Sequence, residues 1–230
     1  IRVGDTVIIE KGGEVIPKIV SVVISKRTGK EKVFKMPSKC PVCEADSIRL
    51  PGEVAYRCQN VSCPAQVEGR IEHFTRRTAM NIEGFGPAII TQLIKNNMVK
   101  DYADLYFLKE EELSNLERMG EKSASNLINA LDESKNNTLA QLIFALGISD
   151  VGEHTAEILA LKYESLDAVA KAISKELQNI RGVGPKVAES IENFFLQKGN
   201  LKAIEKLKKA GINTKRKKEE IVFKGKFTDK

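Results

Sequence analysis

The spacing of apolar side chains changes near residue 71 of this 230-residue chain. Before that point, short β-branched runs at residues 7–9, 15–16 and 19–24 flank the turn Lys11-Gly12-Gly13, and such runs are typical of strands. Pro17 lies inside the apolar stretch that follows this turn, which predicts a strand edge or a bend there. Beyond residue 71, apolar residues recur at helical spacing, as at Ile89, Ile90, Leu93 and Ile94. The pattern therefore predicts a mainly α chain with a short β segment at its start.

Four segments follow from this division. Residues 1–35 are too short to close a core alone, so we interpret them as the end of a sheet that begins upstream. Residues 36–70 contain all four cysteines, and residues 71–212 are helices interrupted by short glycine-containing breaks. In residues 213–230, a charged linker at 214–220 precedes an apolar run that resembles the first strand of another domain. Because the chain opens on strand-like residues without an initiator Met, we expect it to be a piece of a longer protein.

The cysteines have the spacing of a metal site. Cys40 and Cys43 form C-x2-C, Cys58 and Cys63 form C-x4-C, and 14 residues separate the two pairs. Each close pair can place two thiolates on one metal, and two pairs complete a tetrahedral shell. Four protein ligands leave no position for water or substrate, which indicates one structural zinc ion per chain. Free buried thiols, disulfides and an iron–sulfur cluster are the alternatives.

A five-residue phrase occurs four times between residues 82 and 184. It consists of an apolar residue, two variable positions, a second apolar residue and a glycine, and it reads Ile-Glu-Gly-Phe-Gly at 82–86, Leu-Glu-Arg-Met-Gly at 116–120, Ile-Ser-Asp-Val-Gly at 148–152 and Ile-Arg-Gly-Val-Gly at 180–184. A sequence with helix-forming periodicity follows each phrase, and proline comes directly after the first and fourth. The pattern predicts four helix-hairpin-helix repeats.

Glycine suits such a turn for two physical reasons. It permits positive φ, and it lets the backbone approach a ligand without an intervening Cβ. The amides of the turn then point outward at the positive end of the second helix, which makes a site for one phosphate. Such a contact recognises the DNA backbone and carries no base information.

The repeats differ in the side chains that they bring to this site. Arg181 and Lys186 of the fourth repeat are the best candidates for cationic phosphate contacts, and Arg118 replaces the first glycine of the second. Asp150 of the third would repel a phosphate, so we expect that repeat to be architectural. The candidate DNA-binding residues are Gly84, Gly86, Arg118, Gly120, Lys122, Gly152, Arg181, Gly182, Gly184 and Lys186.

Two other architectures use similar patterns. A period near 34 also occurs in helical solenoids such as tetratricopeptide repeats, but their Trp-Gly-Tyr signature is absent and the chain has no Trp. Gly182 to Ala188 imitates the G-x-G-x-x-A of dinucleotide-binding folds, which requires a buried strand before it. Residues 175–180 do not have the sequence of one.

Charge and composition limit the kinds of function that the chain can have. The net charge is +6, but residues 71–212 carry 18 basic and 20 acidic side chains, so any nucleic-acid contact there must use local groups. No apolar run approaches the roughly 20 residues that span a bilayer, and no signal peptide is visible. His73 and His154 are the only histidines. His154 beside Glu153 is more typical of a solvated or capping arrangement than of an acid–base pair.

Together these motifs carry a resemblance. Cys-Pro-x-Cys, then Cys-x-Asn-x-x-Cys-Pro-Ala-Gln at 58–66, followed by four helix-hairpin-helix units, resembles the bacterial NAD-dependent DNA ligases. Residues 4–18 look like the end of that family's OB-fold, and the truncated strand near Phe223 stands where the family places its BRCT domain.

The resemblance implies that the zinc module links the OB-fold to the hairpin domain and that the hairpins grip duplex or nicked DNA. It implies a monomeric, cytoplasmic, nucleoid-associated parent enzyme that seals nicks in replication and repair, using magnesium and NAD as adenylate donor. The family's adenylated lysine lies in a K-x-D-G motif, which does not occur in this sequence. We therefore expect these 230 residues to have no catalytic residue, no NAD site and no ligase activity of their own. The alternative is the hairpin module of a repair nuclease or a recombination accessory protein.

Overall fold

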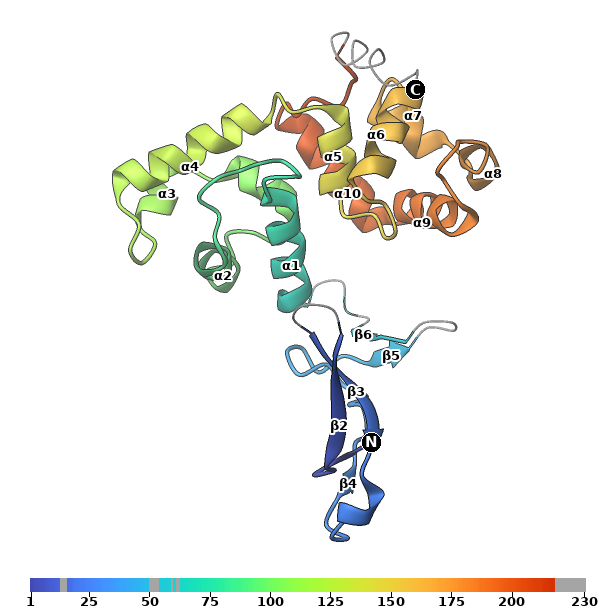
Figure 1. Cartoon of the computed structure of the whole chain (residues 1–230). Coiled ribbons are helices and arrows are strands. Elements are labelled where there is room, and N and C mark those ends of the chain that lie inside the picture. The colour runs from blue at the N-terminus through green and yellow to red at the C-terminus, as the bar shows by residue number, and fades with distance from the viewer. Residues whose placement is uncertain (13–15, 50–53, 59, 61–62, 218–230) are drawn as a thin grey trace. The chain divides into compact units, whose positions relative to one another are not determined.

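The computed structural model describes residues 1–12, 16–49, 54–58, 60 and 63–217 (Figure 1). Contacts between residues divide the chain into two compact units, residues 1–60 and 61–230. The division comes ten residues before the expected start of the helical segment at 71, because the first helix already packs into the helical core through Val67 and other buried side chains. The apolar run expected to form a last strand, residues 221–227, lies outside the described residues.

The first unit contains short antiparallel pairs of strands. They are β1 (Arg2–Val3) with β4 (Lys32–Val33), β2 (Val7–Gly12) with β3 (Ile16–Val22), and β5 (Ser47–Arg49) with β6 (Tyr56–Cys58). A 3-10 turn, η1 (Ile24–Lys26), follows β3. Pro17 pairs with Lys11 in a two-stranded ladder, where each strand has a free edge that tolerates a residue without an N–H.

The β segment has little core within this unit. Ile8, Ile9, Ile19 and Val20 are all exposed, as expected for strands too few to bury both faces. Polar contacts hold the base of the β2–β3 hairpin instead. Arg27 donates two hydrogen bonds, of 2.7 and 2.9 Å, to the carboxylate of Asp5 and lowers its pKa to about 2.

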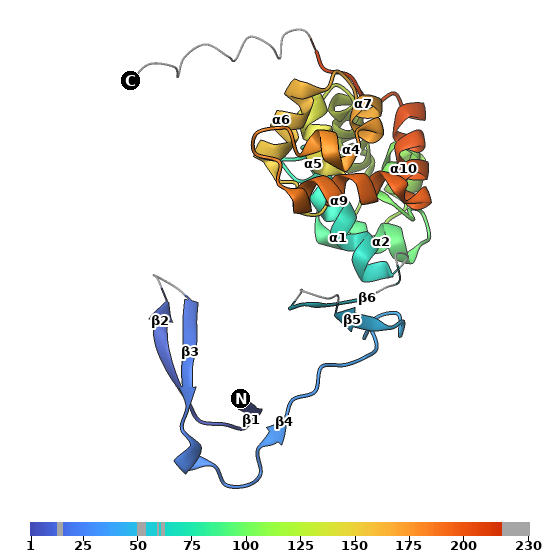
Figure 2. The ribbon, with the colours of Figure 1, turned by 90° about the vertical axis from the view of Figure 1, so that its right-hand side faces the viewer.

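The second unit is helical, as predicted. Its described helices are α1 (Pro64–Thr75), α2 (Pro87–Lys95), η2 (Tyr102–Phe107), α3 (Glu110–Ser114), α4 (Glu121–Ser134), α5 (Leu139–Ala145), α6 (Glu153–Lys162), α7 (Leu166–Lys171), α8 (Ser174–Leu177), α9 (Pro185–Leu196) and α10 (Lys198–Lys209). They gather into one group around a shared core (Figure 2). Among the described residues, no helix combines the length and the apolar character that a membrane span requires.

One continuous apolar cluster joins these helices. It runs from Val67 in α1 to Ile212 after α10, and its fully buried side chains include Phe74, Leu105, Leu142 and others from nearly every helix. Phe74 stacks on Tyr102 with ring centroids 4.7 Å apart. The repeats therefore do not form separate small domains, because each buries its apolar positions in the same core.

A charged contact closes the helical unit between its last helix and η2. Lys206 of α10 lies 2.7 Å from the carboxylate of Asp101 and 2.6 Å from that of Asp104. Burial lowers the pKa of Lys206, but the two carboxylates raise it by more, so the net shift is upward. The ion pairs tie residues about 100 positions apart in the sequence.

The first part of the expected charged linker lies against the helical unit. Backbone hydrogen bonds join Asn213 to Lys135 at 2.9 Å, Thr214 to Leu166 at 2.9 Å and Arg216 to Glu164 at 3.0 Å. The side chain of Asn213 also donates to the carbonyl of Asn137 at 3.0 Å. Residues 213–217, which we call the strap, thus bridge the loop after α4 and the loop after α6.

We predict that the strap contributes to stability although its sequence is that of a linker. A chain ending at Ile212 loses these hydrogen bonds, which should lower the free energy of unfolding by about 1–3 kcal/mol after the entropy of ordering is deducted. A chain ending at Lys217 keeps these hydrogen bonds and should be more stable than the chain ending at Ile212. Urea unfolding followed by circular dichroism measures both, and equal stability of the two truncations would contradict the prediction.

Candidate metal centre and nucleic-acid interface

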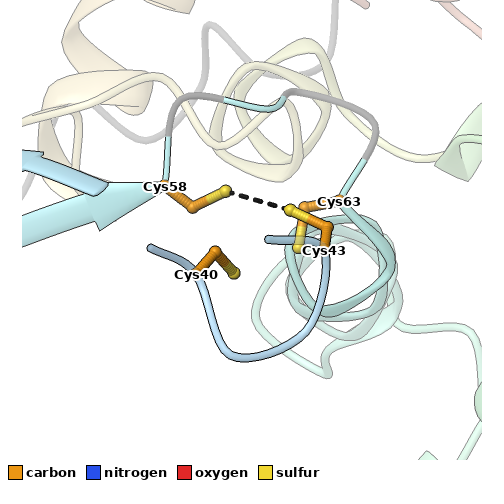
Figure 3. A group of neighbouring side chains, drawn as sticks. All are labelled: Cys40, Cys43, Cys58 and Cys63. Atoms are coloured by element: carbon orange, nitrogen blue, oxygen red, sulfur yellow. Dashed lines mark hydrogen bonds between the residues drawn. The ribbon is translucent and has the colours of Figure 1, made fainter. Parts of the chain in front are cut away.

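The four cysteines come together in space. Their sulfur atoms all lie within 4.8 Å of one another, and the Sγ atoms of Cys43 and Cys58 are 3.5 Å apart (Figure 3). Cys63 is fully buried and Cys40 nearly so. In tetrahedral zinc–thiolate sites, Zn–S bonds of about 2.3 Å place the sulfurs about 3.8 Å apart, so this cluster has the dimensions of such a shell.

Local backbone turns deliver the thiols. The N–H of Glu44 donates to the carbonyl of Cys40 at 2.9 Å, and Glu44 adopts a positive φ of 57°, which folds the C-x2-C segment into a tight knuckle. Cys63 is the N-cap of α1, and Pro64 follows it at the first helical position, where its missing N–H has no cost. The sequence Cys-Pro thus begins a helix immediately after a ligand.

Backbone N–H groups also act on the sulfurs. Donors at Val42 and Cys43 lower the pKa of Cys40. The Asn60 N–H lowers the pKa of Cys58, but desolvation and the neighbouring thiols outweigh it and raise that pKa to about 12. Four thiols this close cannot all ionise without a cation, and a metal ion supplies that charge. The donor set, four soft sulfurs with no oxygen, suits structural zinc.

The four repeated phrases fold as turns with a common pattern of burial. The second apolar residue is buried in every turn, at Phe85, Met119, Val151 and Val183, and the first is buried or half-buried. A helix follows each turn directly, namely α2, α4, α6 and α9. Helices α3, α5 and α8 precede the last three turns, whereas α1 ends at Thr75 and hydrogen-bonded backbone turns lead into the first.

The third position of each phrase has a left-handed backbone. Its φ is 91° at Gly84, 61° at Arg118, 62° at Asp150 and 93° at Gly182. Glycine adopts this conformation without strain, and Asp is among the residues that tolerate it. Arg118 does so at a cost of about 1–2 kcal/mol, which the burial of its apolar neighbours in the turn offsets.

The last glycine of each phrase has a different reason to be glycine. Gly86, Gly120, Gly152 and Gly184 are the N-caps of their helices, with φ between −76° and −93°, a region open to every residue. A Cβ added at any of them would meet no atom within 4 Å. The fold does not require glycine at these positions. The third residue of each turn thus has the positive φ that glycine permits, and the last leaves the backbone open; that a ligand approaches there stays a prediction.

These helix starts also lack side-chain caps. In the described part of the chain, the N-cap residues of α2, α4, α6 and α9 make no side-chain cap hydrogen bond, because each is glycine. By contrast, Thr138 caps α5 and Ser165 caps α7 through their hydroxyl groups. Uncapped first-turn amides beside an exposed glycine form a positive, hydrogen-bonding surface that fits a phosphate.

The expected cationic residues fall into two groups. Arg118, Lys122 and Arg181 are exposed beside their turns; the Arg118 side chain is 91% exposed, and its Nε lies 3.8 Å from a carboxylate oxygen of the neighbouring Glu117. Lys186 is also exposed, but its ammonium group lies 2.9 Å from the carboxylate of Asp150 in the third turn. The structure therefore places one of the two best expected cationic phosphate contacts, Lys186, in an ion pair with the residue expected to repel phosphate.

The turns are associated in pairs, which the sequence did not indicate. A Cβ on Gly84 of the first turn would lie 2.5 Å from Leu127 in α4, the helix after the second turn. A Cβ on Gly182 of the fourth would lie 3.0 Å from Ile158 in α6, the helix after the third. The first and second turns form one pair, and the third and fourth form another.

Polar side chains also join the two turns of each pair, and the sequence did not single them out. Gln92 of α2 bonds to the backbone of Glu117 in the second turn, and Ser190 of α9 bonds to Asp150 in the third at 3.2 Å. The one signal in the sequence is that Gln92 and Ser190 occupy the same position, the sixth residue of a helix that begins with proline.

The histidines do not contribute to either site. His73 contacts the carbonyl of Phe144 at 2.8 Å through Nε2 and packs against that ring. His154 is exposed, with Nδ1 3.7 Å from Glu157.

We predict one zinc ion per chain, removable by a strong chelator. Because metal binding contributes directly to the folding of such modules, its removal should loosen residues 36–63 while the helical unit keeps its circular dichroism. Cys58→Ser should reduce the zinc content in the same way. Elemental analysis of the purified chain with hydrogen exchange tests this, and a metal-free chain with unchanged exchange would refute it.

Comparisons with known proteins find family matches over the cysteine segment and over both pairs of turns. Residues 39–65 match the NAD-dependent DNA ligase C4 zinc finger domain. Residues 77–133 match a SAM-like helix-hairpin-helix tandem and residues 141–204 a helix-hairpin-helix motif, so each match covers one pair of turns.

Curated relatives cover almost the whole chain. A DNA ligase of Carboxydothermus hydrogenoformans is 54% identical over 215 residues, 94% of this chain and 32% of the relative. One of Thermoanaerobacter pseudethanolicus is 48% identical over 98% of this chain and 35% of the relative. A DNA ligase of Geobacter metallireducens is 46% identical over 100% of this chain and 34% of the relative. The chain spans about a third of the length of these relatives. It belongs to the family of NAD-dependent DNA ligases and corresponds to their zinc-finger and helix-hairpin-helix region.

Proposed function

We propose that the helical unit grips the sugar-phosphate backbone of duplex or nicked DNA without sequence preference. It does so as the clamp of an enzyme that seals nicks with NAD as the adenylate donor. The four open glycines that begin α2, α4, α6 and α9 carry this proposal. Nothing in the fold needs a glycine there, but a phosphate needs the space that a side chain would fill.

Backbone amides suit this task because the helical segment is not basic as a whole. Residues 71–212 have more acidic than basic side chains, so a general electrostatic attraction to DNA does not support binding there. Contacts to phosphates must therefore come from the helix N-termini. Exposed cationic side chains near the turns add to them, namely Arg118, Lys122, Arg181 and Lys186. Phosphate contacts of this kind fix the position of the duplex and do not read its bases.

The remaining assignments belong to the same proposal. Residues 1–35 complete an OB-fold, residues 36–70 are the zinc module, residues 71–212 bind DNA, and residues 213–230 lead into a BRCT domain. Residues in these segments perform no chemistry in nick sealing. NAD and magnesium bind to other parts of the full-length enzyme, which acts as a monomer in the bacterial cytoplasm, at the nucleoid.

A different parent protein is the competing proposal. The same hairpins would also serve a repair nuclease or a recombination accessory protein, since backbone gripping is common to these activities. The open glycines do not distinguish the parents, whereas the C4 zinc finger of the ligase type at residues 39–65 favours the ligase. A K-x-D-G lysine upstream of residue 1 would support the ligase, and a nuclease motif there would support the alternative.

We predict opposite effects from the two glycines of the fourth turn. Gly184→Ser adds a preferred N-cap residue and should stabilise the helix by about 0.3 kcal/mol. Its hydroxyl occupies the first-turn amides, so DNA affinity should fall about 3- to 10-fold. Gly182→Ala places a Cβ at positive φ and against Ile158, so it should instead cost about 1–2 kcal/mol of stability.

Fluorescence anisotropy with nicked and intact duplexes measures the affinities, and urea unfolding measures the stabilities. Binding should weaken as salt increases and should vary little with sequence. If Gly184→Ser binds as tightly as the natural chain, the open glycines do not contact phosphate. If the natural chain binds no DNA at low salt, the hairpins alone are a scaffold.

We also predict that residues 71–212 serve sealing and not activation. Their deletion from the full-length enzyme should abolish nick sealing because the duplex is no longer held, while transfer of adenylate from NAD to the enzyme continues. Gel assays with a labelled nicked substrate and with labelled NAD separate the two steps. Normal sealing by the shortened enzyme would disprove the clamp role.

A further inference from the structure

The two pairs of turns are built from the same two kinds of hairpin in opposite order. The first and fourth turns have glycine at the left-handed position and are followed by a helix that begins with proline. The second and third have Arg118 and Asp150 there and are followed by a helix that begins with glutamate. Each pair contains one turn with glycine at the left-handed position, which we call the glycine turn, and one with another residue there, which we call the non-glycine turn.

In the first pair, an amide side chain holds the non-glycine turn. The Oε1 atom of Gln92 accepts from the N–H of Glu117 at 2.9 Å, and its Nε2 atom donates to the carbonyl of Glu117 at 3.3 Å. Glu117 directly precedes the left-handed Arg118. One side chain therefore satisfies both backbone groups of a residue at the point where the turn reverses.

In the second pair, the same position of the proline-initiated helix does the equivalent work. Ser190 of α9 donates to one carboxylate oxygen of Asp150 at 3.2 Å, and Lys186 donates to the other at 2.9 Å. Asp150 is itself the left-handed residue. The group that is held is a side chain here and the backbone of Glu117 in the first pair, but in both pairs the helix of the glycine turn holds the non-glycine turn.

An apolar contact runs in the reverse direction. Leu127, from the helix after the second turn, packs against the backbone of Gly84, and Ile158, from the helix after the third, packs against that of Gly182. Each turn of a pair is thus fixed by the helix that follows the other turn. The two helix N-termini of a pair cannot shift relative to each other without breaking a contact of one kind or the other.

We propose that Gln92 and Asp150 are positioning residues that lock the two turns of each pair into one rigid, two-phosphate site. We call these two sets of polar bonds the cross-turn clamps. The proposal rests on the proposed function and adds that phosphates bind to a pair together. A turn that is already in place loses no freedom on binding, which is why preorganised contacts give higher affinity than mobile ones.

Asp150 separates this proposal from a simpler electrostatic one. A carboxylate beside a helix N-terminus opposes phosphate and engages Lys186, so on charge alone its removal should only strengthen DNA binding. If Asp150 is part of a cross-turn clamp, its removal should weaken DNA binding instead. Asp150→Asn removes the charge, tolerates positive φ, retains one oxygen to accept from Lys186 and gains an amide that can donate to the Ser190 hydroxyl. Asp150→Gly removes charge and acceptor together and is free of backbone strain.

The experiment measures DNA affinity of the zinc-loaded 230-residue chain by anisotropy over a range of salt concentrations, with thermal unfolding alongside. Gln92→Met keeps the length and helix propensity of the side chain and removes both hydrogen bonds. Gln197→Met is the matched control, because that glutamine lies at the opposite end of α9 from the turn. Asp150→Asn and Asp150→Gly are compared directly.

We expect Gln92→Met to bind DNA about 3- to 10-fold more weakly, with a salt slope smaller by about one, as for one lost phosphate contact. The control should match the natural chain. Asp150→Gly should bind about 3- to 10-fold more weakly than Asp150→Asn, although both lack the charge. A merely structural role would lower the melting temperature and leave the salt slope of the folded chain unchanged.

Two results would overturn the clamps while the proposed function stands. One is natural affinity and slope for Gln92→Met, and the other is equal, tighter binding by Asp150→Gly and Asp150→Asn. The absence of DNA binding by the natural chain would overturn the proposed function and the clamps together.

Discussion

Each hairpin must reverse direction within five residues while two of its apolar side chains stay in the core. That constraint forces a left-handed residue at the third position of all four turns, whether or not the residue is glycine. It also exposes the last residue of each turn, since the buried residue just before it points inward. The open helix N-termini are therefore a consequence of how the turns anchor themselves, and a glycine there keeps them accessible.

Under the proposed function, the same constraint explains how a segment with no excess of positive charge would hold DNA. Amides at a helix N-terminus carry partial positive charge that is fixed in direction and independent of the side-chain composition. Acidic residues elsewhere on the surface then cost little, because salt screens exposed charges over about 10 Å. Binding of this kind depends on where the N-termini are, which makes the contacts between turns as important as the turns themselves.

The β segment and the metal centre follow a different logic. The strands of the first unit expose several of their large apolar side chains and bury few, so hydrophobic burial contributes little to their order. Short-range polar contacts such as Asp5 with Arg27, and a metal held by four thiolates, take its place. Small modules without a core commonly depend on such links.

Local spacing in the sequence was enough to predict the thiolate set, the four turns and the mainly α fold. Two or four residues between cysteines already limit how far apart their sulfurs can lie, and a turn of five residues has few possible backbones. Only the tertiary structure decided which turns pair, that Lys186 meets Asp150 36 positions away, and that Gln92 reaches Glu117. It also decided that residues 213–217 lie against the helices, and it showed that the third position of each turn is left-handed while the last is open to every residue. These features depend on helix packing around a common core, which brings distant side chains together without leaving a periodic trace in the sequence.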